Sequence, residues 1–418
     1  MPAPPANFSS SLPIALALTL ITTSAASSPR VEPLPETAPT DYLTFAEGAV
    51  LVSSSTFDAR KSVGSAEAMQ LIDGSPGGFT LVAQAGADGG AELVYSLPAA
   101  TTFESFAVPQ VLETPSPSQT FVQRVTIHGS AAGPEGPWTV LADLTLTRHA
   151  ARGHRTVVPA TTETAVRWVK VRLSGGLDMA RELMFLECSE IVGHGRQEAP
   201  PLSSAFDGTW KGRGVLIELH QDGAMVHGCV DREGAPFTGT VTGNVLRGRS
   251  IAPASQVQSL YVLTVADDQL LGVRSANGAP FRAYEGAPTK VTTPCSEPSP
   301  PVIGCDSVLH GINFDFDSAT IRPDSEPLLK TLFAGLKATP DQSFVIEGHT
   351  SSEGSTEYNQ GLSERRAQAV VADLVRRGLP TARIRAVGRG ELTPIADNAT
   401  ASGRSLNRRV EVHCENGP

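Results

Sequence analysis

A stretch near the C-terminal end, GHTSSEGSTEYNQGLSERRAQAVV at 348–371, holds the side chains best suited to binding a charged ligand. Alternation at Phe344 and Ile346 predicts a strand that leads into it. Apolar residues at helical spacing predict a helix that opens near Tyr358 and whose core stripe contains Ala367, Val370, Val371 and Leu374. Hydroxyl groups of the turn, the amide of Asn359 and a guanidinium then share one concave corner. Such a corner suits a small zwitterion better than it suits a reaction.

Arg365 and Arg366 are consecutive on this predicted helix, whose apolar face is already assigned. Adjacent helical residues point about 100° apart, so the two guanidinium groups cannot face the same way. One of them can look back at the turn while the other faces solvent. A guanidinium matches a carboxylate through two parallel hydrogen bonds, which an ammonium group cannot do. The pair therefore predicts one arginine in the corner.

Other candidates for catalysis or metal binding are weak. The sequence shows no Ser/His/Asp set, zinc motif or phosphate loop. Asp315 and Asp317 share a face of a predicted strand, as a glycosidase pair could, but no matching cleft is predicted. His220 and His227 flank a predicted turn and could face each other, without cysteines or carboxylates at ligand spacing. We therefore expect a non-enzymatic protein with no catalytic residue, no metal and no cofactor.

Composition narrows the class of partner. The chain has 33 Lys and Arg residues against 43 Asp and Glu residues, a formal net charge of −10. Phosphate contacts need a clustered positive face, so nucleic acid is not an expected partner. Abundant Gly and Pro with few aromatic residues are typical of β-rich secreted proteins.

The elements that must position the corner alternate between strand and helix, which favours an α/β layered sheet. Ile312, Phe314 and Phe316 are expected on one side of a first strand. Asp324 or Ser325 is the expected cap of the following helix, whose apolar residues are Leu328, Leu329, Leu332, Phe333 and Leu336. The final strand is expected to place Val410, Val412 and Cys414 on one face, with Arg409 and Glu411 on the other.

Four motifs in this order resemble the OmpA-like C-terminal domain: INFDFDS (312–318), the GHT…YNQGLSERRA core, VGRGE…P (387–394) and GRSLNRRVEV (403–412). That family binds peptidoglycan non-covalently in Gram-negative envelopes. The resemblance implies that Arg366, with an aspartate that follows GHT, holds the diaminopimelate of the peptide stem. It also implies that Asn359, Leu362 and Arg409 line or support the pocket. An ordinary helix-to-sheet polar network is the alternative for all three residues.

One position departs from the family pattern, because Ser351 stands where the family has the aspartate. A hydroxyl offers the ammonium of diaminopimelate only a neutral acceptor. A charge-assisted hydrogen bond is worth ~1 kcal/mol more, so affinity is expected to fall several-fold. Glu353, two residues along the same turn, is our candidate for the missing charge. The alternative is that this domain keeps its fold and has lost glycan binding.

The N-terminal end has the features of an exported chain. Residues 1–26 predict a signal peptide, with an apolar core from Leu12 to Ile21 and small residues at 24–26. No Lys or Arg precedes the core, and no Cys lies near the cleavage site to support a lipoprotein anchor. Residues 27–40 (SSPRVEPLPETAPT) predict an extended Pro-rich spacer.

Residues 41–195 predict a β-sandwich, because short alternating runs are separated by Gly and Pro clusters. Their order resembles discoidin-type, galactose-binding-like domains through SSS (53–55), LIDG (71–74), ELVYSL (92–97), VTIHGS…GPWTVL (125–141) and VRWVKVRL (166–173). That family usually binds through loops at one end of the sandwich, and many members bind no sugar. Trp138 and Trp168 are expected in the core, with sugar stacking as the alternative.

Between 205 and 285 the chain repeats a hairpin pattern. Predicted turns at Asp222-Gly223, Gly243-Asn244 and Asp267-Asp268 indicate a small antiparallel meander or barrel. Linkers are expected at 195–204 and 286–304. The five cysteines leave at least one thiol unpaired, and Cys295–Cys305 or Cys305–Cys414 are two possible disulfides.

The sequence thus predicts a multidomain chain with a β-sandwich, then a small β meander or barrel, then an α/β OmpA-like domain at 305–414. We expect an exported protein of the periplasm or outer membrane that anchors to peptidoglycan through Ser351, Glu353, Asn359, Leu362, Arg366 and Arg409. Its β domains are expected to bind a glycan or an envelope protein. The alternative function is an envelope interaction scaffold without glycan affinity.

Overall fold

The computed structural model describes Met1 and residues 28–55, 69–84, 90–111, 121–146, 153–175, 177–179, 183–231, 233–291 and 303–415. The predicted signal peptide lies outside the described residues. Within the predicted spacer, Arg30–Pro33 form a strand, β1, which pairs with β7 (His154–Pro159). None of the described helices combines the length and apolarity that crossing a bilayer would need.

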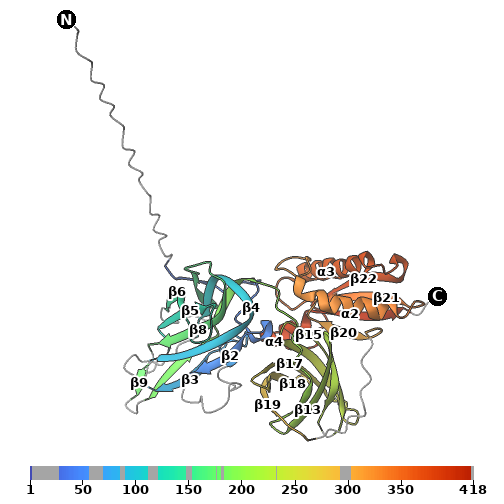
Figure 1. Cartoon of the computed structure of the whole chain (residues 1–418), viewed down its shortest axis with the longest axis horizontal. Helices are drawn as coiled ribbons and strands as arrows, with labels where there is room; N and C mark the ends of the chain where they lie inside the picture. The colour runs from blue at the N-terminus through green and yellow to red at the C-terminus, as the bar shows by residue number, and fades with distance from the viewer. Residues whose placement is uncertain are drawn as a thin grey trace.

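The first β unit (residues 30–197) is built on an eight-stranded antiparallel sheet that curls along its long central strand, β4 (Gly90–Pro109) (Figure 1). The path runs β1, β7, β4, β8 (Val166–Ser174), β5 (Arg124–Ser130) and β6 (Thr139–Thr145). β2 (Val50–Ser54) and β11 (Val192–Gln197) also pair with β4. A three-stranded sheet of β3 (Phe79–Gln84), β10 (Leu183–Cys188) and β9 (Leu177–Met179) shares its hydrophobic core.

The expectation that Trp138 and Trp168 lie in this core is wrong, since both are only half-buried. The buried residues of β8 include Val169, Val171 and Leu173. Trp168 faces the opposite side, together with Lys170. The Lys170 ammonium lies 4.9 Å from the ring centre of Trp138, and the Arg167 guanidinium lies 5.9 Å from that of Trp168. Indole rings on this face therefore contact cations and solvent.

The second unit (residues 208–288, the barrel) settles the choice between meander and barrel. β12 (Gly208–Gly212) pairs with β19 (Arg282–Pro288), which closes the ring. Between them lie β13 (Val215–Asp222), β14 (Met225–Val230), β15 (Ala235–Thr242), β16 (Val245–Ile251), β17 (Gln258–Ala266) and β18 (Gln269–Ala276). Both residues of the Asp267-Asp268 turn have positive φ, as a tight hairpin requires. Large buried side chains such as Phe237 and Tyr261 form a core in this unit.

His220 and His227 are direct cross-strand partners in this barrel, as expected. Their ring centres lie 5.6 Å apart, and His220 Nε2 lies 3.1 Å from Glu218. The pair belongs to neighbouring antiparallel strands, which explains why two histidines seven positions apart meet.

The C-terminal unit (residues 307–415) is the α/β layer that the alternation of strands and helices predicts. Its sheet has the order β20 (Ser307–His310), β23 (Arg409–Glu415), β21 (Ser343–His349) and β22 (Ile384–Gly390). Only β21 and β22 are parallel among these described pairs. α2 (Glu326–Lys337) and α3 (Thr356–Arg376) bury their leucines against one face, and α4 (Ala401–Asn407) precedes the last strand.

Two local predictions in this unit are wrong. The first strand is β20, and the segment from Ile312 to Ser318 turns instead, since Asp317 has a positive φ and the Asp315 N–H bonds the Thr320 carbonyl. Phe316 is accordingly 47% exposed. Ser325 occupies the predicted N-cap position of α2, but neither its side chain nor that of Asp324 makes a capping hydrogen bond, because both bond Asn313 instead. By contrast, α3 begins beside Tyr358 as expected, where the Ser355 hydroxyl accepts from the Tyr358 N–H.

Cysteine pairing follows one of the two options. Cys305 and Cys414 form a disulfide that joins the start of the C-terminal unit to its last strand. Cys229 is also disulfide-bonded, and Cys188 is a buried free thiol. The odd cysteine count therefore leaves one thiol over, as predicted.

The three units meet at a short 3-10 helix, η1 (Phe45–Glu47). From the barrel, Arg247 bonds the carbonyl of Ala46, and Asn244 Nδ2 bonds the carbonyl of Gly48 at 3.0 Å. From the C-terminal unit, Arg408 lies 3.6 Å from Glu47, and α4 packs on η1 (Figure 1). Segments far apart in the chain are thus held together around one turn of helix.

Candidate functional site

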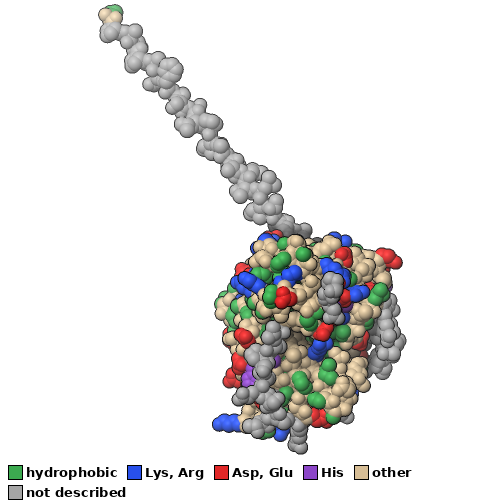
Figure 2. Space-filling view, turned by 90° about the vertical axis from the view of Figure 1, so that its right-hand side faces the viewer, with side chains coloured by type: hydrophobic (Ala, Val, Ile, Leu, Met, Phe, Trp, Pro, Cys, Tyr) green, Lys and Arg blue, Asp and Glu red, His purple; other side chains and the backbone are tan. Residues whose placement is uncertain are grey.

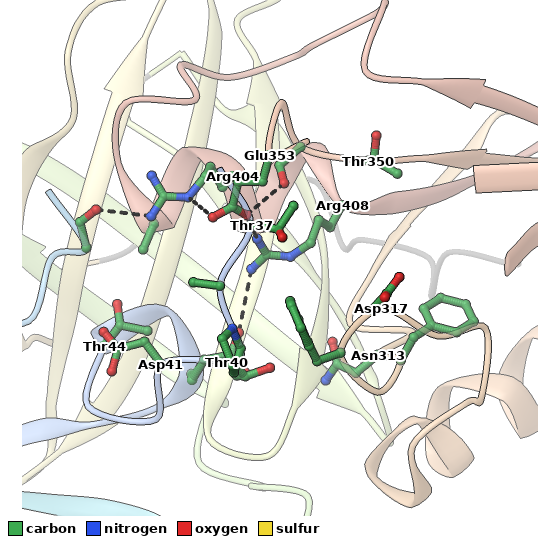
Figure 3. A pocket seen from close by; sticks show the side chains of 18 of the residues that line it. Thr37, Thr40, Asp41, Thr44, Asn313, Asp317, Thr350, Glu353, Arg404 and Arg408 are labelled. Atoms are coloured by element: carbon green, nitrogen blue, oxygen red, sulfur yellow. Dashed lines mark hydrogen bonds and ion pairs between the residues drawn. The ribbon is translucent and has the colours of Figure 1, made fainter. Parts of the chain in front are cut away.

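A cavity of about 350 Å³ lies where the C-terminal unit faces the first β unit (Figure 3). The C-terminal unit lines it with α3, the loop after β20 and the turn after β21. The first β unit lines it with residues 34–41, Glu190 and His194. A side-chain carbon on Gly354 would lie only 3.3 Å from the methyl group of Thr37, which shows how closely the N-terminal segment approaches the turn. The predicted corner is therefore one wall of a pocket shared by two units.

Arg366 lines this pocket, as the sequence predicts, and Arg365 is the exposed member of the pair. Arg366 Nε donates to the Ser318 carbonyl at 3.0 Å, and the guanidinium carbon of Arg366 lies 4.9 Å from the ring centre of Phe314. Among the residues that the structure describes, no carboxylate forms an ion pair with it. Burial lowers the pKa of Arg366 to about 10, so the guanidinium stays protonated at neutral pH.

Ser351 and Glu353 line the same pocket from the turn after β21. The Ser351 hydroxyl donates to Glu353 Oε2 at 3.1 Å. Glu353 also lies 3.5 Å from Arg404 and 3.6 Å from Arg408, between the two guanidinium groups (Figure 3). Its negative charge is therefore shared with two arginines.

The remaining predicted residues, Asn359, Leu362 and Arg409, are buried and line the pocket. Asn359 donates to Glu391, and Leu362 is 6% exposed on the core side of α3. Arg409 is 3% exposed in its side chain, with its Nε 2.6 Å from Glu411 and its Nη2 donating to the Thr393 carbonyl at 3.0 Å. The Arg409 side chain is therefore bonded within the helix-to-sheet polar network that was the alternative role for it.

The opposite end of the pocket carries carboxyl groups that sequence reasoning missed. Asp41 Oδ1 accepts from the backbone N–H groups of Leu43 and Gly193 at 3.0 and 2.8 Å. Burial, opposed by these bonds, raises the pKa of Asp41 to about 7. Burial and the neighbouring Asp41 and Asp73 raise the pKa of Glu190 to about 8. Asp73, beside them, has its pKa raised to about 6 by burial.

One group of side chains could hold a metal ion. Ligand atoms of Glu347, His349 and Glu411 lie within 4.8 Å of one another on the sheet of the C-terminal unit. Glu347 and Glu411 are cross-strand partners, so like charges face each other there. Arg389 and Arg409 pair with these carboxylates and balance them. Burial lowers the pKa of His349 to about 4, which leaves a neutral imidazole inside this network.

Sequence analysis did not predict Asp41, Glu190 or Arg404 as residues of the pocket. Asp41, Glu190 and Arg404 lie on segments that only tertiary packing brings together, through bonds such as Arg404 Nη2 to the Gly74 carbonyl at 3.1 Å. Arg404 and Arg408 do fall within the GRSLNRRVEV motif, and that is the one signal that could have found them.

Residues 313–408 match the OmpA family. Outer membrane porin F of Pseudomonas aeruginosa is 49% identical over 105 residues, which are 25% of this chain and 30% of that protein. Outer membrane protein A of Escherichia fergusonii is 34% identical over 176 residues, 38% of this chain and 72% of that protein. Peptidoglycan-binding protein ArfA of Mycobacterium bovis is 40% identical over 124 residues, 28% and 38% of the two chains. The chain spans between 30% and 51% of the length of the first curated relatives that it matches.

Proposed function

We propose that this chain, which belongs to the OmpA family through residues 313–408, anchors non-covalently to peptidoglycan by binding the diaminopimelate of the peptide stem. Arg366 receives the carboxylate of diaminopimelate, with Phe314 beneath its guanidinium. Ser351 and Glu353 form the facing wall, and Asn359, Leu362 and Arg409 hold that wall in place. The role is binding rather than catalysis.

The observation that carries this proposal is the state of Arg366. Its guanidinium is largely buried, lines an open cavity and has only one backbone carbonyl as a described partner. Desolvating a cation without a counter-charge is costly, and an anionic ligand would relieve that cost. A carboxylate is the anion that a guanidinium receives best, through two parallel bonds.

The relatives and the surface fit this role. ArfA is named as a peptidoglycan-binding protein, and the other two relatives are outer-membrane proteins. We therefore assign the chain to the periplasm or outer membrane of a Gram-negative envelope. Figure 2 shows acidic and basic side chains intermixed over one face, without the extended basic patch that a nucleic acid needs.

Arg366→Ala tests the proposal in a pull-down on purified sacculi, with isothermal titration of a diaminopimelate-containing muropeptide as the second measurement. We expect retention to be lost and the muropeptide affinity to fall at least ~10-fold, since a charge-assisted pair is removed. Arg365→Ala is the matched control, because its side chain is the exposed neighbour on the same helix. Equal retention of the two variants would exclude Arg366 as the anchor.

The competing function is an interaction scaffold whose C-terminal unit has lost glycan binding through Ser351. It predicts that the unsubstituted chain does not bind sacculi at all, whatever the state of Arg366. We further propose that the three units are separate domains with the boundaries 41–195, 205–285 and 305–414. On this division the two β domains remain available for an envelope protein or a glycan.

The half-buried tryptophans of the first β unit favour the glycan as that second ligand. Half-buried indole rings beside Lys170 and Arg167 form a surface on which a sugar ring could stack. A glycan array with the full chain and with Trp138→Ala checks this, and an array without any signal would remove the candidate.

A further inference from the structure

The pocket has two chemically different ends. Arg366 lies at one end, near Asp317, which accepts the hydroxyl hydrogen of Tyr358. Asp41 and Glu190 lie at the other end, on the first β unit. Figure 3 shows Asp41 and Asp317 on opposite sides of the pocket, with Arg408 between them. A ligand that fills the cavity would therefore meet the Arg366 guanidinium, with Asp317 beside it, at one end and the carboxyl groups of Asp41 and Glu190 at the other.

Glu190 is the acidic side chain among the described pocket-lining groups with an unpartnered buried polar atom, which also include Thr350 and His349. Only 7% of Glu190 is exposed, and its Oε2 has no hydrogen-bond partner in the part of the chain that the structure describes. The charge of Arg404 lowers the pKa of Glu190, but the bonds of Arg404 go to Gly74, Asn398 and Glu353. A buried carboxyl oxygen without a donor costs free energy, which a bound donor would recover.

We propose that Glu190 and Asp41 form a second subsite of this pocket, which binds a primary ammonium group of the ligand whose carboxylate Arg366 holds. This inference rests on the proposed function. Ser351 removes an anion from the C-terminal unit, and these carboxyl groups can supply negative charge from another unit once a bound ammonium displaces their protons.

The chemistry of the ends selects a class of ligand. The cavity volume of about 350 Å³ falls in the range of small-molecule pockets, about 300–1,000 Å³. An extended peptide rises ~3.3 Å per residue, so three residues separate a terminal ammonium from a terminal carboxylate by about 10 Å. In the intact polymer the amino end of the stem is an uncharged amide to the glycan. The composite pocket should therefore prefer a released stem peptide with a free amino end.

The test uses the full chain and two probes: the tripeptide alanyl-γ-glutamyl-diaminopimelate with a free amino end, and the same tripeptide N-acetylated. Isothermal titration at pH 7 should show ~10-fold tighter binding of the free-amino probe. In Glu190→Gln that preference should disappear, whereas Glu198→Gln, an exposed carboxylate just beyond the last strand of that unit, should keep it. Asp41→Asn is the second variant, because its amide oxygen can still accept the two backbone bonds.

Proton release provides a readout that a merely structural role would not change. At pH 7 Glu190, with a pKa of about 8, is mostly protonated and Asp41, with a pKa of about 7, is about half protonated, so a terminal ammonium bound between them should displace a proton, whereas an acetylated terminus should not. Titrations in buffers of different ionisation enthalpy measure this directly. Retention of both the preference and the proton release in Glu190→Gln would overturn the subsite while leaving Arg366 in place. Loss of both probes in Arg366→Ala supports the anchor, and absence of binding in the unsubstituted chain would remove anchor and subsite together.

Discussion

Buried carboxyl groups make the junction between the units sensitive to pH. Asp41 and Glu190 have pKa values near 7 and 8 in the folded chain, with burial as the largest cause. Their surroundings comprise Asp73 and Glu47, which are negative, and Arg404, which is positive. A carboxyl group whose pKa is raised on folding contributes its full stability below its unfolded pKa of about 4. That contribution is lost as the pH rises through the folded pKa.

We therefore expect the thermal unfolding midpoint to fall as the pH rises from about 5 to about 8. Glu190→Gln should flatten this decline, because it replaces one titrating group by a neutral isostere. For each such group, every unit of pH between its unfolded pKa of about 4 and its folded pKa costs ~1.4 kcal/mol, or about 3–6 °C for a unit of this size, and the decline levels off above the folded pKa. Glu198→Gln, which is exposed, is the control that should decline like the unsubstituted chain. If the unfolding midpoint of Glu190→Gln falls as steeply with pH as that of the unsubstituted chain, Glu190 is not the group that causes the decline.

Glu353 gives a second prediction at this scale. Since its charge is already shared with Arg404 and Arg408, Glu353→Gln should weaken muropeptide binding only two- to fivefold, less than Arg366→Ala. Calorimetry compares it with Glu357→Gln, an exposed carboxylate in the first turn of α3. An unchanged affinity would exclude Glu353 as a contributor of negative charge, and a loss as large as that of Arg366→Ala would mean that the sharing is unimportant.

How far single residues can be predicted from sequence is clear from the two arginines at 365 and 366. The helical angle between them forecast one arginine in the corner and one in solvent, and the structure agrees. Glu190 could not be forecast, because nothing in its neighbourhood of the sequence distinguishes it from an exposed glutamate. Its burial comes from contacts with segments more than a hundred residues away, such as the Asp41 loop.

At the scale of elements, periodicity predicted regular structure better than turns. The alternating runs became β5, β6 and β8, and the apolar stripe became α3. The INFDFDS segment also alternates, yet it bends because a positive φ at Asp317 and a bond from the Asp315 N–H fold it back. Alternation states which residues could share a face, and it does not state whether a neighbouring strand is present to pair with them. Trp168 shows the same limit, since the hydrophobic character of its own side chain did not place it on the buried face of β8.

The Cys305–Cys414 disulfide fixes the edge of the sheet that carries the site. It joins residues 109 positions apart, next to β20 and within β23. Closing a loop of that size stabilises the folded chain by about 4–5 kcal/mol in the chain-entropy estimate. The paired substitution Cys305→Ser with Cys414→Ser should therefore lower the unfolding midpoint of the C-terminal unit. Cys188→Ser is the control, because it changes a buried free thiol of the first β unit, and it should leave the unfolding midpoint of the C-terminal unit unchanged.

Calorimetric scans that resolve the transitions check this prediction. A C-terminal transition that does not move on removal of the disulfide would show that the sheet is held by its packing alone. Muropeptide affinity at a temperature where the unit stays folded should change little, because neither cysteine lines the pocket.

The whole molecule places its candidate site where two units meet, and this arrangement was not predictable from any one of them. Sequence patterns predicted two β units followed by one α/β unit, and the structure has them in that order. The contacts that join them involve single residues, such as the Ala401 N–H to the Asp73 carbonyl at 3.1 Å and the Thr242 hydroxyl to the Gly311 carbonyl at 3.1 Å. Isolated backbone contacts of this kind have no period and no composition by which a sequence could reveal them.

Gly74, which lines the pocket and whose carbonyl accepts from Arg404, offers a way to loosen that junction while leaving the Arg366 end unchanged. It has a positive φ of 73°, and a side-chain carbon added there would lie 2.0 Å from Cβ of Ala401 at the start of α4. Gly74→Ala should therefore push the first β unit away from the C-terminal unit. Gly77→Ala, in the same loop, meets only the Ser75 hydroxyl at 3.4 Å and is the matched control.

The two ends of the pocket should respond differently to this loosening. Binding of the free-amino tripeptide needs both units, so Gly74→Ala should weaken it about as much as Glu190→Gln does. Retention on sacculi needs only the Arg366 end, so it should stay the same or rise as the N-terminal segment leaves the turn at Gly354. Titration and pull-down on the same preparations measure both. Equal losses in the two assays would mean that the first β unit is required for every mode of binding, and the division of the pocket into two subsites on separate units would then be wrong.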